Sequence, residues 1–163
     1  MQDMLVKLYD LPDLSGLVGE LGAAGVQIRS AFSFEKEIVG DWITAHFSAG
    51  WATEAERGFV ATPISTIIAV DHGILLGFAS YDCTARGFFG PTGVREDQRG
   101  RGIGKALLWA ALKAMWDSGY GYAIIGGVGP AEFYQKVCNA TLIEGSTPGI
   151  YRNLLLAEQT QRA

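Results

Sequence analysis

Apolar positions recur along the chain with two periods, one typical of helices and one typical of strands. The clearest helical segment starts at Ile103, and apolar residues continue at positions 106, 107, 110, 111, 114 and 115. That spacing places all of them on one face of an α-helix, and Gly119 marks its end. We therefore predict a long amphipathic helix that packs its apolar face against a sheet.

Shorter apolar runs predict the strands of that sheet. Residues 65–70 and 74–82 flank the turn Asp71-His72-Gly73, a pattern typical of a hairpin. Residues 88–94 (FFGPTGV) predict an irregular third strand, because proline removes a ladder donor and glycine permits a bulge. Further strands are expected at residues 4–9, 122–128, 141–145 (TLIEG) and 150–156 (IYRNLLL).

The remaining segments predict helices. Asp13 can cap a helix that runs to about Ala23, and Pro130 opens a short helix over residues 131–137. The stretch 26–60 predicts one or two helices. The expected order is β-α-α-β-β-β-α-β-α-β-β, an α/β class fold with a mixed sheet and helices packed against it. No repeat or linker interrupts it, so we expect one domain over residues 1–163.

Composition and charge narrow the function classes. With 48% hydrophobic and 18% charged residues the chain is typical of a globular protein. Its net charge of -4 argues against a general nucleic-acid binder, which needs basic side chains to neutralise phosphates. Cys83 and Cys138 lack CxxC spacing, so we expect no metal site and no disulfide. No apolar run approaches membrane-spanning length and no signal-peptide pattern is present, so we expect a cytoplasmic protein without a membrane partner.

Basic residues gather directly before the long helix, in an otherwise acidic chain. Residues 95–108 read REDQRGRGIGKALL, in which four bases alternate with three glycines. The first turn of a helix carries N–H groups without partners and a partial positive charge, and glycines let an anion approach them. Cations at this position are repelled by the positive end of the helix dipole, so their placement is unfavourable unless an anion is bound beside them. We therefore expect this loop to bind a pyrophosphate group.

Two common phosphate-binding loops do not fit these residues. A Walker A loop requires glycine at position 99 and a hydroxyl at 106, where the chain has Arg99 and Ala106. A dinucleotide fingerprint requires GxGxxG after a straight strand and an acidic residue about 20 positions later. Here the spacing is GxGxG, and Gly-Pro breaks the preceding strand.

The loop from Arg99 to Gly104 resembles the [QR]-x-x-G-x-[GA] motif of the GNAT superfamily of CoA-dependent N-acyltransferases. About 35 residues later, Phe133-Tyr134-Gln135-Lys136 resembles the family signature FYxKxGF. The resemblance covers residues 65–145 well and the N-terminal third by element order. It implies a GNAT-like fold, with a central, mostly antiparallel sheet, a V-shaped splay and flanking helices. It also implies acetyl-CoA as cosubstrate and transfer of its acetyl group to a primary amine by direct attack in a ternary complex.

The resemblance implies roles for individual residues as well. Backbone N–H groups along the loop would hold the CoA pyrophosphate (Arg99, Gly100, Arg101, Gly102, Ile103, Gly104 and Lys105). The N–H of Val94 or Gly93 would bond the cosubstrate near the thioester, where a donor aimed at the acyl oxygen is commonly worth about 3 kcal/mol. Tyr134 would donate a proton to the departing thiolate. Phe88, Phe89 and residues 33–54 would line the acceptor side.

The general base stays open at this stage. Asp82, at the end of the hairpin, is one candidate, and His46 and Glu54 are two others. A relay of waters to backbone carbonyls is an equal alternative.

The chain also departs from the family pattern in two places. Cys138-Asn139 replaces Gly-Phe, and Gly126, Gly127 and Gly129 stand where members often have an asparagine. These departures leave a non-catalytic acyl-CoA-binding or sensing module as the alternative, and a longer acyl-CoA donor as a third interpretation. The amine acceptor, whether small molecule or peptide, is not specified by these residues. A homodimer is compatible with the resemblance.

Overall fold

One open sheet, with seven strands among residues 1–156, organises the fold in the order β2-β3-β4-β5-β6-β1-β7. The computed structural model describes residues 1–156. Every neighbouring pair of strands is antiparallel except β5 and β6, which run parallel. This confirms the mixed, mostly antiparallel sheet. The strands are β1 (Met4–Lys7), β2 (Val26–Ser30), β3 (Thr66–Asp71), β4 (Ile74–Tyr81), β5 (Phe88–Val94), β6 (Tyr122–Ile125) and β7 (Thr141–Leu142).

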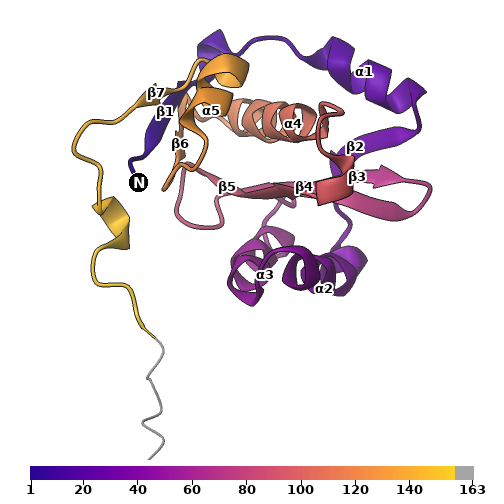
Figure 1. The fold of residues 1–163 in the computed structure, drawn as a ribbon, viewed down its shortest axis with the longest axis horizontal. Helices are drawn as coiled ribbons and strands as arrows, with labels where there is room; N and C mark the ends of the chain where they lie inside the picture. Colours follow the sequence, from indigo (N-terminus) through magenta and orange to yellow (C-terminus); the bar gives the residue numbers. More distant parts are fainter. Residues whose placement is uncertain (157–163) are drawn as a thin grey trace, which may run out of the picture.

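Helices cover both faces of this sheet (Figure 1). One face carries α1 (Ser15–Ala23), α4 (Ile103–Asp117) and α5 (Ala131–Cys138), and the other carries α2 (Lys36–His46) and α3 (Ala49–Glu56). Each face has its own buried apolar cluster, the larger one around α4. Among residues 1–156, no helix has the length and apolar content needed to cross a membrane.

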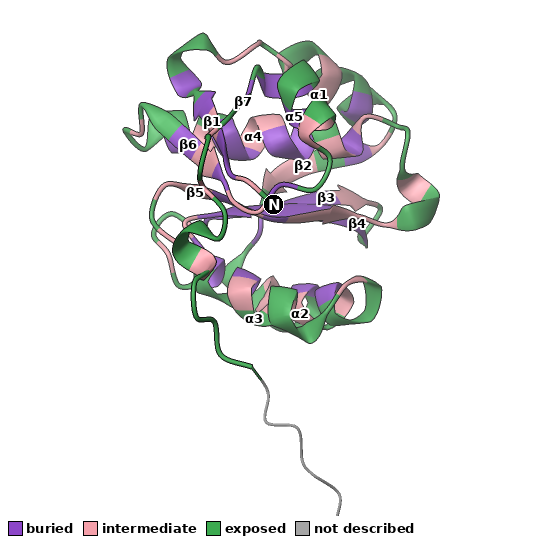
Figure 2. Cartoon of the chain, turned by 60° about the vertical axis from the view of Figure 1, so that its left-hand side comes forward, coloured by how far each residue is buried: buried purple, intermediate pink, exposed green. Residues whose placement is uncertain are grey.

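The predicted amphipathic helix is α4, and more of its surface is buried than one face. Leu108 and Leu112 are buried along with Ile103, Leu107 and Met115. The helix contacts the sheet and α1, and its buried residues share one apolar cluster with those of α5; Figure 2 shows buried segments along the helix. Its apolar side chains therefore form the centre of the larger apolar cluster.

Two predictions about strands were wrong. Residues 26–30 form β2, a strand with only two alternating apolar positions, which pairs with β3 alone at the sheet edge. Residues 150–156 form no strand: Gly149–Tyr151 is a 3-10 turn, and Leu154 to Leu156 are exposed with no strand beside them. An apolar run without a partner has no ladder to join. The end of the predicted domain, residues 157–163, lies outside the described residues.

The sheet opens between β5 and β6. These two strands pair only at Phe88 and Phe89, opposite Ile124 and Ile125. Beyond that point β5 continues along β4 as far as Val94, so residues 90–94 have no strand on their other side. This register is the V-shaped splay that the resemblance implied, and it exposes one edge of β5 inside the molecule.

Candidate functional site

The loop between β5 and α4 owes its shape to glycine. Gly100 and Gly102 have φ angles of 81° and 84°, in the left-handed region that side chains disfavour. Gly102 caps α4, and its carbonyl accepts the first helical bond, from the Ala106 N–H at 3.0 Å. The N–H groups of the next three residues therefore have no partner within the helix. They border a groove of about 340 Å³.

We call this cavity the loop groove and define it by its lining residues. They come from the end of β5, from the glycine loop with the first turn of α4, and from α5 (Val94, Gln98, Arg99, Gly100, Gly102, Ile103, Gly104, Lys105 and Phe133). The structure thus brings both sequence motifs to one groove. Of the predicted pyrophosphate ligands, Arg101 is the one that does not line it.

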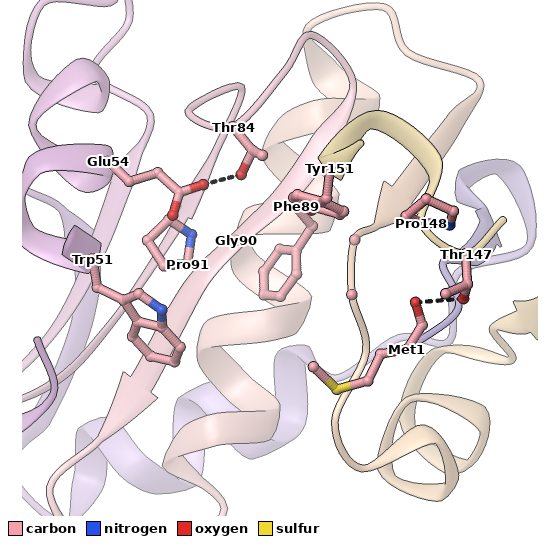
Figure 3. Close-up of a pocket in the computed structure, with 12 residues that line it drawn as sticks. Met1, Trp51, Glu54, Thr84, Phe89, Gly90, Pro91, Thr147, Pro148 and Tyr151 are labelled. Atoms are coloured by element: carbon pink, nitrogen blue, oxygen red, sulfur yellow. Dashed lines mark hydrogen bonds between the residues drawn. The ribbon is translucent and has the colours of Figure 1, made fainter. Parts of the chain in front are cut away.

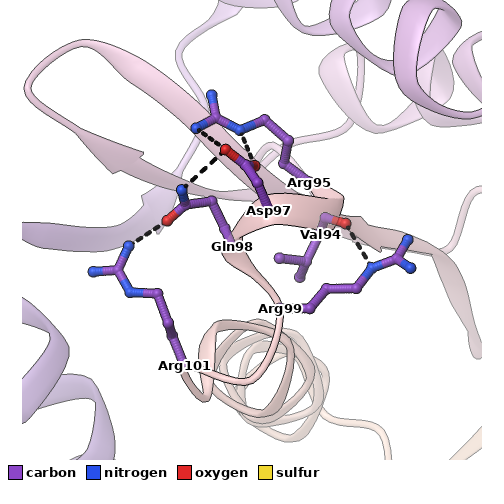
Figure 4. Close-up of polar contacts among 6 residues, drawn as sticks. All are labelled: Val94, Arg95, Asp97, Gln98, Arg99 and Arg101. Carbon is purple, nitrogen blue, oxygen red and sulfur yellow. Dashed lines mark hydrogen bonds and ion pairs between the residues drawn. The ribbon is translucent and has the colours of Figure 1, made fainter.

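The four bases of the loop differ in what they contact, and Figure 4 shows the three arginines among them. Arg95 donates to the Asp97 carboxylate at 2.6 and 3.0 Å, which lowers the pKa of Asp97, and Arg101 donates to the Gln98 side chain. Arg99 reaches back to the Val94 carbonyl at 3.3 Å. Lys105 is exposed at the groove and forms no ion pair within residues 1–156. Arg99 and Lys105 are therefore the cations available to an anion in the loop groove.

Val94 directs its peptide groups toward the open edge of β5. The N–H of Arg95 donates to Leu76 on β4 at 2.8 Å, and successive residues of a strand point their N–H groups to opposite sides. The N–H of Val94 therefore faces away from β4, and so does its carbonyl, which Arg99 contacts. This donor is accessible to a ligand that lies along the splay.

Gly93 differs from Val94 in the direction of its N–H group. It stands opposite Phe78 in the ladder, so its N–H faces β4. A Cβ at this position would lie 2.3 Å from the Phe47 ring. Of the two backbone donors that the resemblance suggested, the geometry favours Val94, and Gly93 is explained by the close approach of Phe47.

Tyr134 lies between two aromatic neighbours on α5 and β5. Its ring meets Phe133 edge-on at 5.1 Å and Phe89 at 6.4 Å, and only 8% of the residue is exposed. Burial, with a smaller contribution from Cys138, raises the pKa of Tyr134 to about 12. The phenol is therefore protonated at neutral pH, which is the form that a proton donor needs.

A second cavity, of about 500 Å³, opens on the α3 side of the splay (Figure 3). We call it the α3 pocket. Its walls come from α3, from the β4–β5 connection and β5, from the end of β6, and from the two ends of the described chain (Met1, Trp51, Glu54, Thr84, Phe89, Gly90, Pro91, Gly126, Gly127, Thr147, Pro148 and Tyr151). The ring of Tyr134 contacts Phe89, which lines this pocket, and Phe133, which lines the loop groove, while Tyr134 itself lines neither cavity.

The three candidate bases lie in different places. Asp82 accepts hydrogen bonds from the Gly87 N–H at 2.7 Å and the Tyr120 hydroxyl at 2.8 Å, so its carboxylate holds a loop, and it lines neither cavity. His46 is exposed and its ring rests on Trp42. Glu54 lines the α3 pocket and accepts a hydrogen bond from the Thr84 hydroxyl. Within residues 1–156, no group of three or more His, Cys, Asp and Glu is placed to hold a metal ion.

Sequence patterns did not reveal Thr84 or Tyr151 as pocket residues. Thr84 has no motif around it, and Tyr151 lies in the segment that we predicted as a strand. The ideal Cβ of residue 126 would lie 2.2 Å from the Tyr151 hydroxyl, so the glycine there accommodates this ring. Burial raises the pKa of Tyr151, and the charges of Asp3 and Glu54 raise it further. The tyrosine is therefore a neutral wall of the pocket.

Comparisons with known proteins agree with this geometry. The family model for the acetyltransferase (GNAT) family matches residues 29–139. A GCN5-related glucosamine N-acetyltransferase region of a fungal multi-domain GH3 β-N-acetylglucosaminidase has a TM-score of 0.72 at 14% identity, over 87% of this chain. A GNAT family acetyltransferase from Brucella melitensis, in complex with acetyl-CoA, has a TM-score of 0.55 at 15% identity, over 72% of this chain and 86% of its own.

Coverage of the similar structures differs widely. The chain spans 19% of the fungal protein and 48% of a GCN5-related N-acetyltransferase from Sphaerobacter thermophilus, which has a TM-score of 0.59 at 17% identity. A comparison with curated protein sequences gave no significant match. At these identities the likeness establishes the fold, and the chemistry must be argued from the chain itself.

Proposed function

The chain belongs to the acetyltransferase (GNAT) family, and we propose that it transfers the acetyl group of acetyl-CoA to a primary amine by direct attack within a ternary complex. The observation that carries this proposal is the placement of two cavities on the two sides of one open strand edge, with the Tyr134 ring in contact with a lining residue of each. The loop groove suits an anion, and the α3 pocket holds a carboxylate that suits a cation.

The loop groove fits the pyrophosphate of acetyl-CoA. Partner-free N–H groups of the first turn of α4, with Arg99 and Lys105 beside them, would bind its charge. The thioester arm would then follow the open edge of β5, where the N–H of Val94 is accessible. A donor there would stabilise the negative charge that develops on the acyl oxygen during attack. The buried phenol of Tyr134 would supply the proton that the departing thiolate takes.

The departure at Cys138-Asn139 removes no lining group from either cavity, whereas Gly126 and Gly127 line the α3 pocket in place of the asparagine that members often have. Asn139 ends α5 with a left-handed φ of 54°, and Cys138 is buried with its Sγ donating to the Tyr134 carbonyl at 3.2 Å. Both residues act on the fold of α5. The alternative of a non-catalytic acyl-CoA-binding module is therefore distinguished by measuring binding and turnover on the same samples.

Calorimetric titration of acetyl-CoA tests the donor site, with the variant Gly104→Glu and the control Gly104→Ala. Gly104 is helical without a positive φ, and a Cβ there would meet its nearest neighbour, the Val94 side chain, at 3.6 Å, an ordinary contact. Alanine also satisfies the family motif at this position. Glutamate in the first turn suits the helix dipole, so the fold is retained while a negative charge enters the groove. We expect micromolar binding to the wild type and the alanine variant, and a loss of at least about 30-fold in the glutamate variant.

The same samples then test turnover, by release of the CoA thiol with a panel of primary amines that includes glucosamine. Acetylation of any of these amines supports the enzyme. Acetyl-CoA binding without acetylation of any of them supports the binding module instead. Equal affinity of Gly104→Glu and wild type for acetyl-CoA contradicts the assignment of the loop groove.

A further inference from the structure

We propose that Glu54 binds the ammonium group of the acceptor and takes its proton, and that the acceptor is a small monoamine carried on a ring or a similar apolar frame. The proposal rests on the function proposed above and names its base and its acceptor class. Three observations carry it: the position of Glu54, the way its carboxylate is held, and the composition of the walls around it.

Glu54 is placed at the point where the splay begins. It projects from α3 into the α3 pocket beside Gly90 and Pro91, as Figure 3 shows. These are the first residues of β5 that lack a partner on the β6 side. A nucleophile held by Glu54 is therefore next to the strand edge along which the thioester arm is expected to lie.

The carboxylate of Glu54 is held and has no cationic side chain beside it in the pocket. The Thr84 hydroxyl donates to Oε1, which fixes the side chain and leaves Oε2 without a hydrogen bond to any described residue. No Lys, Arg or His lines the pocket within residues 1–156, and its other ionisable groups are the Tyr151 hydroxyl and the amino group of Met1. A carboxylate without a paired cation is a site for a cationic ligand.

The other residues that line the α3 pocket indicate the chemical character of the rest of the ligand. Trp51, Phe89, Pro91, Pro148 and Tyr151 present rings to a cavity of about 500 Å³. Glu54 is the one carboxylate among the twelve residues that line it. A second ammonium group would lie against apolar rings without a counter-charge, which is unfavourable. The pocket therefore suits one cation on an apolar frame.

The proposed groups account for every proton transferred and every bond formed or broken in the reaction. Glu54 takes one proton from the ammonium group and returns it to solvent. The neutral amine nitrogen then attacks the acyl carbon, so that a C–N bond forms and the C–S bond breaks. The thiolate takes the proton of Tyr134, and the nitrogen gives up its second proton, which restores the phenol. The sum is an ammonium and acetyl-CoA converted to an acetamide, CoA and one proton.

Glu54→Gln tests the assignment, with Glu56→Gln as its matched control on the same helix. Glu56 pairs with Lys36 at the surface and lies outside the α3 pocket, so the control makes the same charge change without touching the site. The probes are benzylamine, which is protonated at neutral pH, and benzhydrazide, which carries the same ring with a neutral nucleophilic nitrogen. Only the first needs a base.

We expect Glu54→Gln to lower kcat/KM for benzylamine about 100-fold, within the usual contribution of a general base. The loss for benzhydrazide should stay below about threefold, the affinity for acetyl-CoA should not change, and Glu56→Gln should match the wild type. Equal losses for both nucleophiles, or no loss for either, would overturn the role of Glu54. Acetylation of putrescine or a lysine peptide but not benzylamine would overturn the acceptor class.

Thr84→Val provides the second test, which applies even where Glu54→Gln does not fold. It removes the hydrogen bond to Oε1 and keeps the carboxylate, so we expect about a tenfold loss with benzylamine and none with benzhydrazide. An unchanged rate with benzylamine contradicts the positioning of Glu54 by Thr84. If the wild type binds acetyl-CoA but acetylates neither these probes nor any amine of the panel, the failure lies in the proposed transfer reaction itself.

Discussion

The loop groove and the α3 pocket lie on two sides of one strand edge, but they are built from different parts of the chain. The loop groove is formed mainly by one continuous segment and offers backbone N–H groups, whose directions follow from two glycines and a helix start. The α3 pocket is formed by side chains from segments as far apart as Met1 and Tyr151. A site built from backbone N–H groups can be recognised from a short sequence motif. A site built from dispersed side chains is specific to the individual protein.

This difference between the two cavities matches the difference between the two ligands proposed for them. A shared cosubstrate such as acetyl-CoA can be bound by a backbone arrangement that many sequences form. An acceptor that differs between relatives must be recognised by side chains, which are free to vary. The following predictions test this division, beginning with Tyr134, whose ring contacts a lining residue of each cavity.

Tyr134→Phe should give the largest effect, on the rate of transfer. The substitution keeps the ring between Phe89 and Phe133 and removes only the hydroxyl, so binding at either cavity should be preserved. We expect kcat to fall about 100-fold, as for loss of a general acid. Steady-state kinetics measured beside the calorimetric affinity for acetyl-CoA will show it. An unchanged kcat would remove Tyr134 from the reaction.

The same hydroxyl should affect stability at alkaline pH. Its folded-state pKa of about 12 exceeds the usual value of about 10, so above pH 10 the unfolded chain loses this proton first. The stabilisation is complete below pH 10 and is lost as the pH rises toward 12, by an amount on the order of 2 kcal/mol. Urea unfolding at pH 9 and pH 11.5 should show a larger decrease for the wild type than for Tyr134→Phe. Parallel decreases would contradict the shift.

Gly93→Ala should destabilise the side of the sheet that carries α2 and α3. The added Cβ would lie 2.3 Å from the Phe47 ring, which must move away, and overpacking of this kind costs about 2 kcal/mol in the free energy of unfolding. Urea unfolding measures the loss.

A double-mutant comparison provides the control for Gly93. In a Phe47→Ala background the same substitution should cost less than about 0.5 kcal/mol, because the ring that it displaces is absent. An equal cost in both backgrounds would show that Gly93 is required by something other than this contact.

Lys105→Ala and Arg101→Ala should give the smallest effect and separate two bases of one motif. Lys105 lines the loop groove without an ion partner among the described residues, whereas Arg101 is bonded to Gln98 and does not line it. Losing a hydrogen bond to a charged group costs about 1.5 kcal/mol, so we expect about a tenfold weaker Kd for acetyl-CoA in Lys105→Ala. The loss in Arg101→Ala should stay below about threefold. The reverse order would contradict the arrangement of the groove.

The sequence predicted the position of the loop groove because its signals are local. The apolar period from Ile103 identified α4, and the glycine-basic pattern located the groove at its first turn. Both features depend on residues a few positions apart. The turn Asp71-His72-Gly73 likewise identified the β3–β4 hairpin, in which His72 and Gly73 adopt positive φ.

The α3 pocket was predicted only in part because its contacts are long-range. The resemblance pointed to Phe89 and to residues 33–54, which include Trp51 and Glu54, but Thr84 and Tyr151 were missed. Glu54 and Thr84 are separated by 30 positions, and neither carries a pattern that joins it to the other. Tyr151 belongs to an apolar run that resembled a strand, although no strand lies beside it. Asp82 was a candidate base from its place at the hairpin end, and the structure shows its carboxylate bonded to Gly87 and Tyr120.

The open edge of β5 has a consequence for the protein before it meets its ligand. An unpaired strand edge is a template on which other chains can assemble, and proteins normally cover or interrupt it. Residues 90–94 leave such an edge inside the molecule, and acetyl-CoA bound along it as proposed would also complete the sheet. A ligand at 100 times its Kd adds about 2.7 kcal/mol to the stability of the folded state. The supply of acetyl-CoA would then influence both the rate of the reaction and the fraction of the protein that is folded.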